Sequence, residues 1–148
     1  SCTGGLASSL LTSLPGSSAF MLGAVTSYAT DVKKNVLKVS DDTIEKYGVI
    51  SKECALEMAE GVRSIMDSDY SFSITGVAGP DLQEDKSVGT LCFGFSSRYR
   101  ESESIEIHLR SWGRESVRRR ASIAAFILLS GYIRGESTEE IAKSWVVF

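Results

Sequence analysis

Apolar residues recur at three- and four-residue steps in three stretches of the chain, and this spacing predicts amphipathic helices. The first covers Leu6–Leu14, the second opens at Ser51, and the longest covers Glu115–Ile133. Residues that cap or end helices predict three more short ones. These cover Val32–Leu37, a stretch that starts at Ser40 and stops at Gly48, and Ser137–Lys143.

Runs of apolar residues, in places alternating with polar ones, predict strands between these helices. They are Ala19–Tyr28, Tyr70–Thr75, Val88–Ser97, Ser104–Arg110 and a terminal Trp145–Phe148. Because helices and strands alternate without a linker or repeat, we expect residues 1–148 to form one α/β domain. The predicted architecture is a three-layer α/β/α sandwich around a mixed sheet.

Composition narrows the class of protein. The chain has 148 residues, of which 43% are hydrophobic and 24% charged. This is globular composition, which excludes a disordered or fibrous protein. No apolar run approaches the ~20 residues of a membrane span, and a net charge of −3 argues against a general nucleic-acid binder. The run Arg118–Arg120 is interpreted as a solvated helix surface.

Cysteine and histidine usage argues against metal chemistry. Three widely spaced cysteines without a Cys-x-x-Cys pair predict reduced thiols in a cytoplasmic protein. The single histidine, His108, falls on the polar face of a predicted strand, where we expect it to be solvated. A Ser-His-Asp triad would have to use this residue. We therefore expect no metal.

Two glycine-bearing segments can carry chemistry. The turn Ser1-Cys2-Thr3-Gly4-Gly5 precedes a helix, so it can bind an anion, stabilise an oxyanion or expose a nucleophilic hydroxyl; the alternative is an ordinary capping turn. The loop over Gly76–Ser87 follows a strand and begins Gly-Val-Ala-Gly-Pro-Asp. Such loops bind ligands in open α/β folds, although this one matches neither a P-loop nor a dinucleotide fingerprint.

Five blocks occur in an order that resembles a known family. They are Ser-Cys-Thr-Gly-Gly-Leu, Pro-Gly-Ser-Ser-Ala-Phe, Val-Thr-Ser-Tyr-Ala-Thr-Asp-Val-Lys, Ile-Thr-Gly-Val-Ala-Gly-Pro-Asp and Lys-Ser-Val-Gly-Thr. From Ser1 to about Gly131 the chain is similar to the C-terminal domain of the competence/damage-inducible CinA proteins. As a separate protein, that domain is a nicotinamide-nucleotide amidohydrolase.

The resemblance implies an activity. It is hydrolysis of nicotinamide mononucleotide (NMN) to nicotinate mononucleotide and ammonia, a salvage step of pyridine nucleotide metabolism that needs no cofactor. A cytoplasmic homodimer without membrane or nucleic-acid partners is also implied. The alternative is a non-catalytic nucleotide-binding or protein-interaction module, which would bind a nucleotide without turnover.

The resemblance also assigns roles to individual residues. Ser1 falls on the family's nucleophile, and Tyr28 and Lys33 fall on its conserved tyrosine and lysine. A lysine with a lowered pKa can take the serine proton, and the tyrosine can relay that proton or hold the lysine. The implied oxyanion and substrate contacts are Thr3, Gly4, Gly5, Ser17, Ser18, Thr75, Gly76 and, for the 5′-phosphate, Arg114.

The sequence departs from the family pattern in several places. Leu82-Gln83 replaces a Gly-Gly pair after Gly-Pro-Asp, and Thr30 replaces an asparagine. The helix and strand that precede the family's serine are also missing, and there is no initiator methionine, so we expect an excised or incompletely recorded N-terminus. One hypothesis is that Trp145–Phe148 fills the vacant place in the sheet, within the chain or by exchange with a second subunit; the alternative is a frayed tail.

Overall fold

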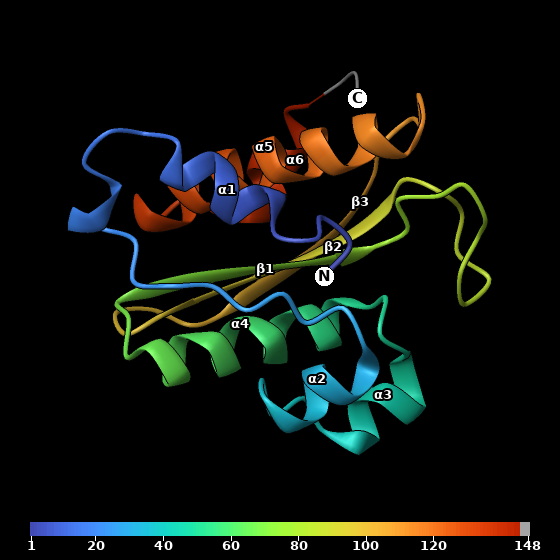
Figure 1. The fold of residues 1–148 in the computed structure, drawn as a ribbon, viewed down its shortest axis with the longest axis horizontal. Coiled ribbons are helices and arrows are strands. Elements are labelled where there is room, and N and C mark those ends of the chain that lie inside the picture. The colour runs from blue at the N-terminus through green and yellow to red at the C-terminus, as the bar shows by residue number, and fades with distance from the viewer. Residues whose placement is uncertain (146–148) are drawn as a thin grey trace.

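The computed structural model describes residues 1–145 (Figure 1). Within these residues, ten elements follow one another. They are α1 (Leu6–Thr12), η1 (Ser17–Ala19), α2 (Thr30–Asn35), α3 (Asp41–Tyr47), α4 (Lys52–Met66), β1 (Tyr70–Gly76), β2 (Thr90–Ser97), β3 (Glu103–His108), α5 (Arg114–Ile133) and α6 (Thr138–Lys143).

The predicted three layers are confirmed. Helices α1, α5 and α6 cover one face of the sheet, and α4 covers the other, with α2 and α3 beyond it (Figure 1). Each side has its own apolar core. Phe93 and Phe95 of β2 pack toward α5, whereas Cys92 belongs to the cluster on the α4 side, as the alternation of side chains along a strand requires.

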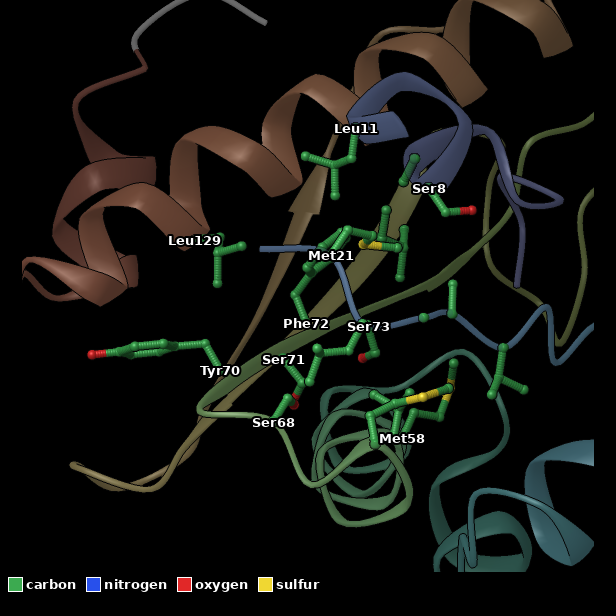
Figure 2. A pocket seen from close by; sticks show the side chains of 18 of the residues that line it. Ser8, Leu11, Met21, Met58, Ser68, Tyr70, Ser71, Phe72, Ser73 and Leu129 are labelled. Carbon is green, nitrogen blue, oxygen red and sulfur yellow. The ribbon is translucent and has the colours of Figure 1, made fainter. Parts of the chain in front are cut away.

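The sheet differs from the prediction in strand direction. The described strands have the order β1-β2-β3 and are antiparallel throughout, not mixed. The predicted strand Ala19–Tyr28 is also wrong, because residues 21–28 belong to neither a helix nor a strand. Met21–Thr26 and Tyr70–Ile74 both line a cavity of about 570 Å³, and no backbone hydrogen bond joins the two segments in the described structure. Leu11, Met21, Phe72 and Leu129 lie around this apolar cavity (Figure 2).

Local capping explains the starts of three predicted helices, whereas the predicted helix Val32–Leu37 is observed as Thr30–Asn35, without a side-chain cap. The hydroxyls of Ser40, Ser51 and Ser137 each accept the backbone N–H three residues on, at the starts of α3, α4 and α6. Gly48 ends α3 at a φ of 78°, a value that favours glycine. Trp145 follows α6 in a turn, donating its N–H to Ala142 at 3.1 Å, rather than in a strand. The rest of the predicted terminal strand, residues 146–148, lies outside the described residues.

Three hydroxyls on one face of β1 bind this strand to α4 and the turn before it. Ser71 donates to the Ala59 carbonyl at 2.6 Å, and Ser73 donates to the Ala55 carbonyl. The third, Thr75, donates to the carbonyl of Val49 at 2.8 Å. All three side chains are buried, so β1 has a polar face that points into the protein. This series holds Thr75 in place at the end of the strand.

The remaining sequence expectations have mixed outcomes. The three cysteines are free, as expected, and all are buried; His108 is exposed. The basic run is not simply a solvated surface. Arg118 donates to the Thr3 carbonyl at 3.0 and 3.3 Å, and Arg120 lies over the Trp112 ring at 4.5 Å. No helix within residues 1–145 is long and apolar enough to cross a membrane.

Candidate active site

A cavity of about 310 Å³ lies where β1 ends, and we call it the polar cavity. It combines side chains from α2, α5 and the chain before α1 with the loop that follows β1. Several predicted site residues meet in it. They are Ser1, Tyr28, Lys33, Thr75, Gly76 and Arg114, which line it together with Cys2, Thr30, Val49, Ile50 and residues 77–83.

Ser1 is held against the end of β1. Its backbone nitrogen donates to the Ile74 carbonyl, and its hydroxyl donates to the Thr75 hydroxyl at 3.3 Å. Because Thr75 gives its own proton to Val49, its oxygen is left to accept the proton of Ser1. The lone pairs of the Ser1 oxygen therefore remain available to a nucleophilic reaction in the cavity.

Lys33 is a buried amine on α2, with 2% of its surface exposed. Its Nζ donates to the carbonyl of Ser27 at 2.7 Å and, more weakly, to that of Tyr28 at 3.4 Å. Burial lowers the pKa of Lys33, because the charged form loses its hydration. Among the described residues no carboxylate forms an ion pair with it. Both features favour the neutral amine.

Tyr28 and Arg114 form one wall of the polar cavity. The Arg114 guanidinium donates to the Tyr28 hydroxyl at 2.8 Å and to the Gly79 carbonyl at 2.6 Å. The Tyr28 side chain is 59% exposed, so its hydroxyl faces Arg114 while its carbonyl contacts Lys33. This arrangement favours the holding role of Tyr28 over the proton-relay role, and it places a cation at the cavity rim.

The structure does not bring every predicted site residue into the polar cavity. Thr3 and Gly5 line the apolar cavity instead, and the Gly4 N–H is donated to the Ser1 carbonyl at 2.9 Å. Of the three proposed oxyanion donors, Gly4 is therefore already engaged. Ser17 and Ser18, in η1, line neither cavity. Their assignment as substrate contacts stays a prediction without support from this arrangement.

Arg118 is a residue near the site that the sequence reasoning missed. Its two hydrogen bonds to the Thr3 carbonyl connect α5 to the turn that follows Ser1. It also pairs with Glu115 at 2.9 Å. Helical spacing gave one usable signal, since Arg114 and Arg118 are one turn apart and share a face of α5. Within the described chain, no group of three or more His, Cys, Asp or Glu side chains could hold a metal ion.

The residues that form the polar cavity lie in a part of the chain that is similar to known proteins. The family model "CinA C-terminal domain" matches residues 1–133. The CinA-like protein of Fervidobacterium nodosum is 41% identical over 130 residues, which cover 87% of this chain and 31% of that protein. The CinA-like protein of Pseudothermotoga lettingae is 51% identical over 94 residues, 63% of this chain and 23% of that protein. The chain thus spans less than a third of these relatives' length.

Solved structures of proteins with competence/damage-inducible names also resemble this chain. The competence damage-inducible protein A of Klebsiella pneumoniae superposes with a TM-score of 0.85 at 28% identity, covering 90% of this chain and 83% of that one. A competence/damage inducible protein of Agrobacterium tumefaciens has a TM-score of 0.77 at 30% identity, covering 88% and 80%. On both sequence and structure, the chain belongs to the CinA C-terminal domain family.

Proposed function

We propose that this chain hydrolyses the carboxamide of nicotinamide mononucleotide, releasing nicotinate mononucleotide and ammonia. The observation that carries the proposal is the buried Lys33 amine, which shares one cavity with the Ser1 hydroxyl. A serine hydroxyl becomes an effective nucleophile only when a neighbouring base takes its proton. The cavity volume of about 310 Å³ is at the lower end of the range for small-molecule sites.

The geometry of Lys33 suits a general base. A neutral lysine amine has two N–H bonds and one lone pair, and two carbonyls, those of Ser27 and Tyr28, accept the N–H bonds. The lone pair is then left to receive the Ser1 proton once the Ser1 hydroxyl turns from Thr75 toward Lys33. In the proposed first step the Ser1 oxygen bonds to the carboxamide carbon while its proton passes to Lys33.

The remaining steps restore the enzyme. Lys33 returns the proton to the leaving nitrogen, the carbon–nitrogen bond breaks, and ammonia departs from an acyl-Ser1 ester. Water then attacks this ester and gives its proton to Lys33, which passes it to Ser1 as the carboxylic acid leaves. In solution the acid ionises to the carboxylate, and its proton converts the ammonia to ammonium. One water is consumed for each ammonia released, so the steps balance.

Arg114 provides a binding site for the phosphate end of the substrate. Two of its nitrogens are fixed by Tyr28 and Gly79, which orients the guanidinium plane at the cavity. Guanidinium groups bind phosphate with two parallel hydrogen bonds. Arg114 also begins α5, a 20-residue helix whose N-terminal dipole favours an anion.

The direct test is incubation of the chain with nicotinamide mononucleotide. We expect ammonia and nicotinate mononucleotide to appear in equal amounts, and we expect EDTA to leave the rate unchanged because the described residues offer no metal-ligand cluster. The rate is measured with a coupled ammonia assay and the nucleotide by chromatography. A substrate-induced rise in melting temperature without ammonia would contradict hydrolysis and favour the binding-module alternative.

The pH dependence of the reaction should report Lys33. Since burial lowers the pKa of Lys33 and only the neutral amine can accept a proton, kcat/KM should rise with pH through that lowered pKa. The rising limb is expected below the value of about 10.4 that an ordinary lysine shows. A profile of kcat/KM between pH 5.5 and 10 checks this. A rate that falls with rising pH over this range would contradict a lysine base.

A further inference from the structure

One carboxylate of the loop after β1 is held by the opposite wall of the polar cavity. Glu84 accepts the N–H of Val49 at 3.1 Å through Oε1 and the N–H of Ile50 at 3.0 Å through Oε2. These two N–H groups precede α4, whereas Glu84 belongs to the loop between β1 and β2. The carboxylate therefore connects two walls that are 34 residues apart in the chain.

The backbone on both sides is shaped for this contact. Gly48 has a φ of 78°, which favours glycine, and a Cβ there would lie 2.5 Å from the Glu84 carboxylate and displace it. On the other side, Glu84 and Asp85 have φ values of 51° and 59° in a tight turn. That turn is closed by two hydrogen bonds between Gln83 and Lys86, of 3.1 and 2.9 Å. This turn directs the Glu84 carboxylate toward the N–H groups of Val49 and Ile50.

The contact also reaches Ser1. The Ile50 N–H and the Val49 carbonyl are the two ends of one peptide group. Glu84 holds the N–H end, and Thr75 donates to the carbonyl end at 2.8 Å. Thr75 in turn accepts from Ser1 at 3.3 Å. A hydrogen-bonded series thus runs from Glu84 through a single peptide group to the hydroxyl of Ser1.

We propose that Glu84 is a positioning residue of the active site. Its carboxylate fixes the loop of residues 77–83 that forms one wall of the polar cavity, and it orients the peptide group that aligns Thr75 and Ser1. This role rests on the proposed function for its catalytic consequence, but the contact itself can be measured without any substrate.

The matched variants are Glu84→Gln and Asp85→Asn. Each removes one negative charge from the same exposed turn, and the Asp85 side chain forms no hydrogen bond or ion pair with the described residues. Glutamine retains one acceptor oxygen, but its NH2 group takes the place of the second oxygen. This NH2 group is a donor and cannot accept the second backbone N–H. We expect KM for nicotinamide mononucleotide to rise about tenfold in Glu84→Gln, the effect of losing one charge-assisted hydrogen bond, with kcat falling less than about threefold.

Hydrogen exchange supplies a readout that does not depend on activity. By NMR, the amides of Val49 and Ile50 should exchange about tenfold faster in Glu84→Gln and unchanged in Asp85→Asn. Unchanged exchange at both amides in Glu84→Gln would overturn the positioning role, as would an equal rise of KM in the two variants. If exchange responds as expected while the unmodified chain has no deamidase activity, the contact stands and the proposed function fails.

Discussion

Ser1→Ala, Lys33→Met and the double variant are expected to lower kcat for nicotinamide mononucleotide hydrolysis by similar factors, each about 10³. Without the Ser1 hydroxyl there is no oxygen to deprotonate, and without the Lys33 amine that hydroxyl remains a weak nucleophile. Groups that act as one unit give non-additive losses. Single-turnover rates of the three variants, measured at one pH, test this.

The lysine at the next position of α2 gives a matched control. Lys34 forms an ion pair with Asp41, and its side chain is 36% exposed, so Lys34→Met should leave kcat within about twofold of the unmodified value. Lys33→Met should also make the melting temperature less dependent on pH. Folding lowers the pKa of Lys33, so its charged form costs folding free energy below that pKa, and the cost disappears as pH rises.

Two outcomes would contradict the assigned roles. Turnover that survives both single substitutions would remove Ser1 and Lys33 from the chemistry. Losses that multiply in the double variant would mean that the two residues act in separate steps, so that Lys33 would not be the base for Ser1.

The elements that the sequence predicted correctly are those fixed by local interactions. Ser40, Ser51 and Ser137 start helices with hydrogen bonds that span three residues, and Gly48 ends one through its own backbone conformation. Such signals need no knowledge of the rest of the fold. The long amphipathic helix was likewise predicted to within one residue of Arg114–Ile133.

The errors concern interactions between distant segments. Nothing in the composition of residues 21–28 says whether a second segment pairs with them, and in the described structure no strand does. Strand direction likewise depends on how connections cross the sheet. Ser71, Ser73 and Thr75 alternate along β1, but their acceptors, the carbonyls of α4 and of Val49 before it, are brought to this face only by the fold.

At the site, too, some residues were placed from the sequence while the long-range contacts were not. The resemblance to the family placed Ser1, Lys33, Thr75 and Arg114, and all four line one cavity. It could not indicate that the Tyr28 hydroxyl contacts Arg114, or that Arg118 holds the turn after Ser1, because both contacts join segments about 90 or more residues apart. The contact of Glu84 is also of this long-range kind, because its partners lie on the opposite wall of the polar cavity.

Gly94→Ala is expected to lower the free energy of unfolding by about 3 kcal/mol. Gly94 lies in β2 directly beneath α4, and a Cβ there would be 2.1 Å from the Ala55 carbonyl oxygen and 2.9 Å from the Leu56 nitrogen. These are backbone atoms of a helix that is itself bonded to β1 through Ser73, so neither side can yield cheaply. The helix must move away from the sheet and lose part of its packing.

Gly23→Ala provides the control for this substitution. Gly23 also has an ordinary φ, but a Cβ there would meet only the terminal sulfur and methyl of Met66, a flexible side chain. Its unfolding free energy should change by less than about 0.5 kcal/mol. For a chain of this size, the expected loss in Gly94→Ala corresponds to a melting temperature lower by about 10 °C, which differential scanning calorimetry would resolve. If both variants had the same melting temperature, α4 would not lie as close to β2 as it does in the structure. The hydrogen bond between Thr75 and Val49 depends on that close approach, so it would be called into question as well.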